Sequence, residues 1–196
     1  MKKIIVPEAM EASIMSLVPR VLNEIKQVFE HVKQDEVDAY ASALARAKRV
    51  FLFGAGRVGT ASRGFAMRLA QLGKMAYWVL DDTTPSIRSE DVFVANSGSG
   101  SSLSTFNMAI AAKKAGADVI TVTAAPNGKI AALADVVLNL PAQTFKTDST
   151  AWSSVLPMGS QFELCLWILL DIVSMTLMRM LNVGERDMGH RHRNLE

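Results

Sequence analysis

The stretch NSGSGSS, residues 96 to 102, places serine hydroxyls and glycines directly ahead of a segment of helical composition. Its candidate binding residues are Ser97, Gly98, Ser99, Ser101 and Ser102. The hydroxyls can donate to phosphate oxygens, the glycines let backbone N–H groups approach, and a helix N-terminus adds partial positive charge. A serine cap on a flexible turn would explain one of these hydroxyls but hardly all of them. The pattern therefore predicts a phosphate cradle.

A second glycine-rich turn, VFLFGAGRVG, places Gly54, Gly56 and Gly59 at G-x-G-x-x-G spacing after an apolar run. This spacing fits a dinucleotide site, a turn serving a smaller ligand, or close packing of a helix on a strand. Asp81 and Asp82 follow the next apolar run, where a dinucleotide site would bind a ribose hydroxyl. However, the helical start of the chain leaves only about 150 residues for five βα units, without a further domain for a redox substrate. A dinucleotide-dependent dehydrogenase is therefore the least favoured interpretation.

Two further regions carry groups that could move protons. Glu163 ends a long irregular stretch, and an acid–base role competes with a capping box, because Ser160 to Glu163 has the form S-x-x-E. In the tail GERDMGHRHRNLE, His190 and His192 stand among arginines, and a merely solvated tail is the competing interpretation. Other polar residues of the irregular stretch could close over a ligand: Lys146, Thr147, Asp148, Ser153 and Ser154.

Five short apolar runs must position these loops: RVFLF, MAYWVL, DVFVAN, DVITVT and DVVLNL. Their continuous apolarity predicts strands covered on both faces, as in a parallel sheet with helical crossovers. Apolar residues at helical spacing predict helices over residues 7–32 and 36–47. We therefore expect an α/β fold, a five-stranded parallel sheet in a three-layer αβα sandwich, with ligands beyond the carboxyl ends of the strands.

A single domain is predicted over residues 1–196, because no linker or internal repeat divides the chain. Within it, residues 1–48 form a helical segment and 49–141 the sheet core, and 142–196 carry the active-site loop, a buried helix and the tail. The apolar segment 162–181 approaches the length of a membrane span, but Glu163, Asp171 and Arg179 interrupt it. We interpret it as a buried helix covered by the sheet and by another subunit.

Net charge and cysteine content indicate which partners and which cellular compartment are to be expected. A net charge of +2 gives no reason to expect a nucleic-acid partner. The single cysteine, Cys165, and a start that lacks the pattern of a signal peptide favour a reducing cytoplasm.

The motifs GAGR, NSGSG, AKKAGA, PMGSQFE and RHRNLE together resemble the 6-phospho-3-hexuloisomerases of the sugar isomerase (SIS) domain superfamily. The resemblance spans essentially the whole chain, and PMGSQFE and RHRNLE are much more specific than the glycine loop. It implies a five-stranded, flavodoxin-like SIS fold, a homotetramer with shared active sites, and neither a cofactor nor a metal. The implied reaction interconverts D-arabino-hex-3-ulose 6-phosphate and D-fructose 6-phosphate, the step after hexulose-6-phosphate synthase in the ribulose monophosphate route of formaldehyde fixation.

That reaction assigns roles to particular residues. Glu163 would move a proton between adjacent carbons of a cis-enediol intermediate, and Arg57 would stabilise the developing oxyanion. His192 would transfer protons between the oxygens or open the sugar ring, in its own or in a neighbouring subunit. The loop with Gly54 and Gly56 would approach the sugar phosphate.

Three positions depart from the family pattern: Val58 replaces the usual serine, Ser101 and Ser102 replace Glu-Thr, and Arg193 replaces alanine. Two alternatives stay open within the superfamily. One is another aldose–ketose isomerase, such as the arabinose 5-phosphate type, which usually carries a further regulatory domain. The other is a non-catalytic sugar-phosphate sensor, whose DNA-binding helix-turn-helix the short helical preface does not convincingly provide.

Overall fold

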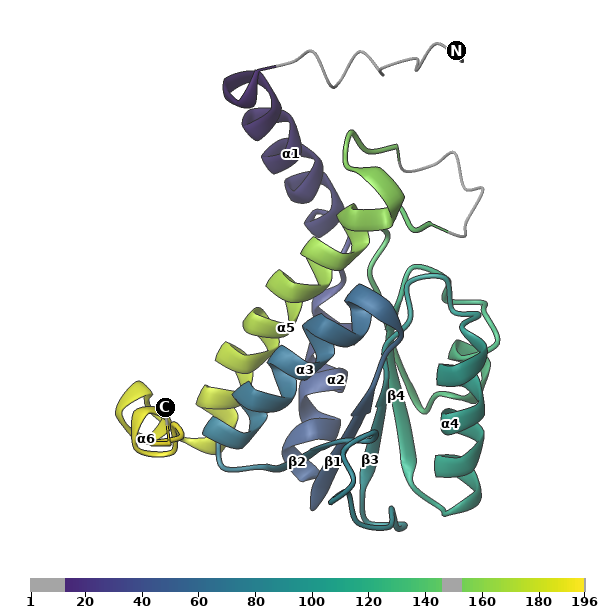
Figure 1. The fold of residues 1–196 in the computed structure, drawn as a ribbon, viewed down its shortest axis with the longest axis vertical. Helices are drawn as coiled ribbons and strands as arrows, with labels where there is room; N and C mark the ends of the chain where they lie inside the picture. Colours follow the sequence, from purple (N-terminus) through teal and green to yellow (C-terminus); the bar gives the residue numbers. More distant parts are fainter. Residues whose placement is uncertain (1–12, 146–152, 196) are drawn as a thin grey trace.

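Five parallel strands form the centre of the structure, a computed structural model in which residues 13–145 and 153–195 are described (Figure 1). The strands are β1 (Arg49–Phe53), β2 (Met75–Trp78), β3 (Val92–Ala95), β4 (Asp118–Thr123) and β5 (Val136–Asn139). Their order is β2-β1-β3-β4-β5, and every neighbouring pair is parallel. The predicted five-stranded parallel sheet is confirmed.

Helices cover both faces of this sheet (Figure 1). They are α1 (Ile14–Phe29), α2 (Gln34–Arg46), α3 (Gly56–Gln71), α4 (Leu103–Lys114), α5 (Ser160–Leu181) and α6 (Glu185–His190), with short 3₁₀ turns η2 (Ala131–Leu133) and η3 (Pro157–Gly159). Core residues of α2, α3 and α5 cluster on one face, and those of α4 lie on the other. The three-layer arrangement therefore agrees with the expectation.

The strands are continuously apolar because successive side chains enter opposite layers. In β1, Val50 and Leu52 join the cluster with α2, α3 and α5, whereas Phe51 and Phe53 join the cluster with α4. All of these side chains are buried. Alternating polarity is therefore absent from β1, as both-face burial requires.

Helix α5 is only partly covered within one chain. In the described part of the chain it belongs to the one helix, 157–181, that has the length and apolar composition of a membrane span. One side packs chiefly on α3 and α2, and its buried residues include Cys165, Leu169 and Val173. Buried residues of α5 belong to the same core cluster as residues of β1, β3, β4 and β5, which agrees with the expected cover by the sheet, and α2 and α3 also pack against α5.

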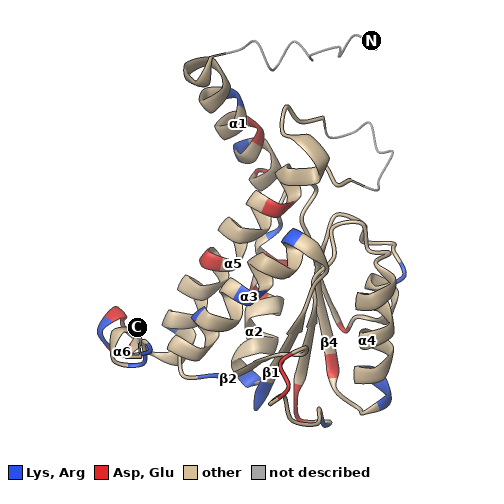
Figure 2. Ribbon diagram, in the orientation of Figure 1, with Lys and Arg blue, Asp and Glu red and all other residues tan. Residues whose placement is uncertain are grey.

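The other side of α5 stays open to solvent, and so does the first half of α1. Exposed apolar residues there are Ile14, Met15, Val18, Leu22, Leu164, Trp167, Ile168, Ile172, Met175 and Met180. Figure 2 shows that charged residues are sparse along α5 and gather around α6. A large exposed apolar face of this kind is more typical of an interaction surface than of a surface that stays in contact with water.

Candidate active site

A cavity of about 160 Å³ lies beyond the carboxyl ends of β1 and β3, where α3, α4 and α5 begin. Its lining residues are Ala55, Val58, Asn96, Ser97, Gly98, Ser99, Ser102, Thr144, Phe145, Met158, Gly159 and Glu163. Parallel strands collect ligand-binding loops at this edge. The serine loop and the Glu163 carboxylate, far apart in the sequence, therefore meet in one cavity.

The serine loop presents its hydroxyl groups at the start of α4. Ser102 is the N-cap residue of α4, yet its side chain makes no capping hydrogen bond, and its Oγ lies 3.3 Å from Ser104 Oγ. Ser99 Oγ lies 3.1 Å from Ser101 Oγ, and Ser97 is almost fully buried. Ser101 is exposed and does not line the cavity. The simple capping interpretation is thus not realised at Ser102, which leaves its hydroxyl available to an anion.

Close approach at this loop explains its first glycine. A Cβ atom at Gly98 would lie 2.9 Å from both Phe162 Cδ1 and Thr144 Cγ2. The Gly98 carbonyl accepts hydrogen bonds from Ala124 N at 3.0 Å and from Thr123 Oγ1 at 3.3 Å. The loop is therefore pressed between β4 and the start of α5, with little freedom to move.

The glycine-rich turn after β1 is mainly a packing device. A Cβ at Gly59 would lie 2.3 Å from the Gly54 carbonyl oxygen, so the two glycines lie back to back. Gly56 adopts a left-handed backbone with φ of 59°. Ala55 and Val58 line the cavity, whereas Gly54 and Gly56 are not among its lining residues. A substrate-binding role for these two glycines stays a prediction.

The acidic residue expected of a dinucleotide site has a different partner. Asp81 Oδ1 accepts a hydrogen bond from Arg63 Nη2 at 3.3 Å, and the Arg63 guanidinium lies over the Trp78 ring. Neither Asp81 nor Asp82 lines the cavity. The aspartates therefore belong to the surface beside the edge strand β2.

Glu163 lies in the first turn of α5 and forms an ion pair with Arg57 in the first turn of α3. The Glu163 side chain is 18% exposed and lines the cavity, whereas the Arg57 side chain is 66% exposed and is not among the lining residues. The alternative capping box is contradicted, because the N-cap of α5 is Gly159, not Ser160. The Glu163 carboxylate is consequently directed to Arg57 and the cavity.

Asn96 is a site residue that the sequence reasoning did not single out. Its side chain is fully buried, and its Oδ1 accepts from Val122 N at 3.0 Å and from Tyr40 Oη at 3.3 Å. Its Nδ2 donates to Ser62 Oγ at 3.1 Å. Asn96 thereby joins α2, α3 and β4 directly before the serine loop. The sequence signal that could have identified Asn96 is its position directly after a buried strand.

Two predictions for the irregular stretch have different outcomes. Lys146, Thr147 and Asp148 lie outside the described residues. Ser154 is described, and its hydroxyl donates to the carboxylate of Glu24 in α1. Ser154 does not line the cavity, so it contributes to the loop and not to the ligand surface.

His192 is not brought to Glu163 of the same chain. With a rise of about 1.5 Å per residue, the helix from Glu163 to Leu181 is about 27 Å long. The tail is fixed at that far end, where Arg191 Nη1 donates to the carbonyl of Gln71, the last residue of α3 (3.2 Å). His192 can therefore reach a Glu163 cavity only in another copy of the chain.

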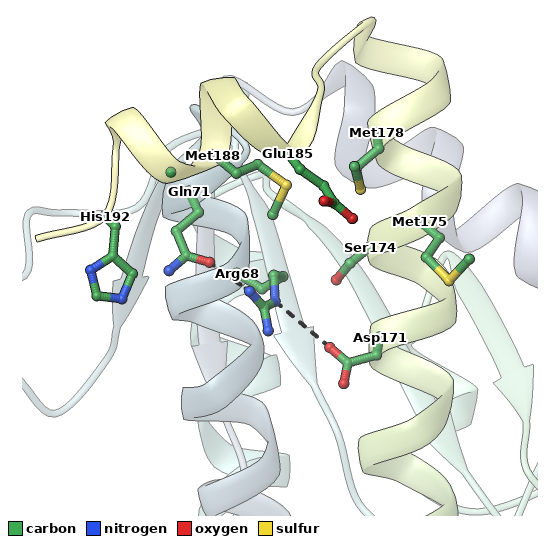
Figure 3. Close-up of a pocket in the computed structure, with 10 residues that line it drawn as sticks. Arg68, Gln71, Asp171, Ser174, Met175, Met178, Glu185, Met188 and His192 are labelled. Atoms are coloured by element: carbon green, nitrogen blue, oxygen red, sulfur yellow. Dashed lines mark hydrogen bonds and ion pairs between the residues drawn. The ribbon is translucent and has the colours of Figure 1, made fainter.

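Figure 3 shows His192 at a second cavity, about 410 Å³ in volume, between α3, α5 and α6. Met175, Met178 and Met188 supply apolar lining. Arg68 Nε and Asp171 Oδ1 lie 3.8 Å apart beside it. Helix α6, which the sequence reasoning took for part of a charged tail, forms one wall.

Cys165 takes no part in the chemistry of the site, although it lies only two positions after Glu163. The thiol is buried in the core, and this burial raises its pKa to about 12. A thiol in that state is a poor nucleophile at neutral pH.

The turn before α5 yields a stability prediction. Gly159 has φ of 80°, and a Cβ there would lie 2.5 Å from Phe145 N. We expect Gly159→Ala to lower the free energy of unfolding by about 1–3 kcal/mol from the backbone conformation alone, and by more because the contacted atom is backbone. Urea denaturation measures the change. Gly189→Ala is the control, since nothing lies within 4 Å of its Cβ position. Equal stability of the two variants contradicts this account of the turn.

Comparisons with known proteins agree with this geometry. The SIS domain model matches residues 43–166. A 3-hexulose-6-phosphate isomerase of Methanocaldococcus jannaschii is 36% identical over 83% of this chain and 85% of its own length. One of Bacillus subtilis is 31% identical over 91% of this chain and 97% of its own. A crystal structure from Methanococcus jannaschii, said to infer a 3-hexulose-6-phosphate isomerase function, has a TM-score of 0.79 and 33% identity, covering 91% and 98% of the two chains.

Proposed function

Because the chain belongs to the SIS domain family, we propose that it is a 3-hexulose-6-phosphate isomerase, which interconverts D-arabino-hex-3-ulose 6-phosphate and D-fructose 6-phosphate. The observation that carries the proposal is one cavity in which the serine loop faces the Glu163 carboxylate. A phosphate group and a proton-transfer centre on the same small ligand match these two features. The ligand is a sugar phosphate.

The phosphate binds at the serine loop. Ser97, Ser99 and Ser102 line the cavity at the N-terminus of α4, where hydroxyls and the helix dipole favour an anion. Binding the phosphate fixes one end of the sugar, so that remote binding energy orients the reacting carbons.

Glu163 is the base for the carbon-bound proton. Its carboxylate removes the proton from C2, the electron pair forms the C2–C3 double bond, and the C3 carbonyl oxygen becomes an enediolate oxygen. The enediolate oxygen O3 then takes up the proton lost from O2, the carbonyl forms at C2, and the electron pair of the C2–C3 double bond takes the proton that Glu163 returns to C3. Hydrogen is only redistributed within the sugar, so the net reaction requires no external oxidant or reductant. Arg57, which pairs with Glu163, stabilises the enediolate oxygen.

His192 of a neighbouring subunit completes the site. It moves protons between the two oxygens or opens the furanose ring, for which an imidazole titrates in a suitable range. The distance within one chain supports this assignment, because the tail is fixed at the far end of α3. The open apolar side of α5 and α1 supports the assembly that brings copies together, a homotetramer with shared sites.

The cellular setting follows from the substrate. Hexulose-6-phosphate synthase, which joins formaldehyde to ribulose 5-phosphate, supplies the ketose, so the two enzymes work in sequence in the ribulose monophosphate route. The cytoplasm, where these phosphates are made, is the compartment we propose.

A coupled assay tests the function. Formaldehyde, ribulose 5-phosphate and hexulose-6-phosphate synthase are combined with the purified protein, and fructose 6-phosphate is measured. We expect fructose 6-phosphate to form only when the protein is present, and arabinose 5-phosphate given alone to be converted far more slowly. Absence of product contradicts the proposal and favours the sensor, whereas faster conversion of arabinose 5-phosphate favours the other isomerase.

A further inference from the structure

The loop ahead of α5 is tied to α1 through one carboxylate. Glu24 Oε2 accepts a hydrogen bond from Ser154 Oγ, and Glu24 Oε1 accepts one from Val155 N at 3.1 Å. Ser154 Oγ in turn accepts from Leu156 N at 3.1 Å. Both oxygens of Glu24 and two consecutive backbone N–H groups of the loop are therefore engaged in a single local network.

This network lies shortly before a turn that has two successive residues in the left-handed conformation. Met158 and Gly159 follow Leu156 and both have left-handed backbone, with φ of 58° and 80°. Met158 is not a glycine, and such a conformation costs of the order of 1–3 kcal/mol and persists only where its surroundings hold it. The anchored loop on one side and α5 on the other provide that restraint.

The turn at Met158 and Gly159 determines the position of the Glu163 side chain. Met158 and Gly159 line the cavity themselves, and α5 begins at Ser160, so Glu163 lies in the first helical turn after them. Phe162 N also donates to the Gln143 carbonyl at 3.2 Å, which holds the same turn from the side of β5. A displacement of the loop would therefore rotate or shift the first turn of α5 and the carboxylate that it carries.

Helix α1 packs against α5 and is held mainly near its C-terminal end, where Val28 is buried and Ile25 packs against the core. Figure 1 shows α1 extending beyond the sheet alongside the loop before α5. Glu24 is half-buried between these two segments, whereas Glu30, the C-cap residue of α1, is exposed and pairs with Lys26.

We propose that Glu24 is a positioning residue for the isomerase reaction, acting through Ser154 and Val155 to hold the Glu163 carboxylate in its reactive place. This inference rests on the proposed function. It concerns proton transfer and not phosphate binding, since the serine loop belongs to a different part of the cavity wall. Glu24 does not touch the substrate itself.

Kinetics of four variants test the proposal: Glu24→Ala, Glu24→Gln, Ser154→Ala and the double variant Glu24→Ala/Ser154→Ala. We expect Glu24→Ala to lower kcat by about 10- to 100-fold, the scale of a misplaced catalytic group, while KM for the hexulose phosphate stays nearly constant. Glu24→Gln keeps one acceptor oxygen and should retain more activity. The double variant should lose no more than Glu24→Ala, because both changes break one network.

Glu30→Ala is the matched control, because it removes an exposed carboxylate at the C-cap of α1, and it should keep the wild-type kcat. A wild-type kcat for Glu24→Ala, a rise in KM in place of a fall in kcat, or an equal loss in Glu30→Ala overturns the proposal. Fully additive losses in the double variant overturn it as well.

Amide hydrogen exchange separates this proposal from the proposed function, because it needs no turnover. In Glu24→Ala we expect faster exchange at Val155 and Leu156 and across the first turn of α5, with exchange in β1 unchanged. If the wild-type protein has no isomerase activity, the proposed function fails and exchange alone decides this inference. Unchanged exchange in the first turn of α5 overturns it.

Discussion

Replacing Glu163 by glutamine should lower kcat by about 10²- to 10⁴-fold, the usual contribution of one positioned acid–base group. Glutamine has nearly the same shape and can still accept a hydrogen bond from Arg57, which now pairs with the carboxylate. It cannot remove a carbon-bound proton. Steady-state kinetics in the coupled assay measure the loss, and KM should change little because the phosphate binds elsewhere in the cavity.

Ser99→Ala is the control for Glu163→Gln. Ser99 lines the cavity in the serine loop, so its loss should raise KM with a smaller effect on kcat. The two variants should therefore separate phosphate binding from proton transfer. Turnover near the wild-type level in Glu163→Gln removes Glu163 from the mechanism.

Mixing two inactive variants should restore activity. His192→Ala alone should also lose about 10²- to 10⁴-fold in kcat, as should truncation after Arg186, because both remove the same imidazole. If each site takes Glu163 from one subunit and His192 from another, hybrids of Glu163→Gln and His192→Ala chains contain some sites with both wild-type residues. Random assembly of equal amounts gives about a quarter of such sites in a closed oligomer.

The hybrids are formed by co-expression or by refolding the two chains together, and kcat is compared with that of each variant treated alone. Activity near a quarter of the wild-type level is the expected result. Activity no greater than the average of the two parents contradicts the shared site, and a fully active truncated chain shows that the tail takes no part in the reaction.

The sheet was predictable because strands buried on both faces appear in the sequence as continuous apolar runs. RVFLF and DVITVT correspond residue for residue to β1 and β4. The serine loop was equally accessible, since its polar residues follow a buried strand and precede a helix. Local pattern was sufficient for both features.

Features that depend on contacts distant in sequence could not be predicted in this way. The S-x-x-E form at Ser160 suggested a cap, but the N-cap is Gly159, at a position where a side chain would collide with the backbone of Phe145. Likewise, periodicity indicates that α5 is apolar without indicating which helices cover it. The hydrogen bond between Glu24 and Ser154 joins residues 130 positions apart, which no local pattern encodes.

Helix α5 has Glu163 in its first turn and leads to the tail at its last, so in the proposed shared-site assembly each protomer would contribute to two different active sites. Activity would then require contacts between subunits as well as binding of the sugar phosphate. A small molecule that wedges against Trp167 and Ile172, on the open side of α5, would act as a non-competitive inhibitor. Its potency would fall as enzyme concentration rises, which distinguishes it from any mimic of the hexose phosphate.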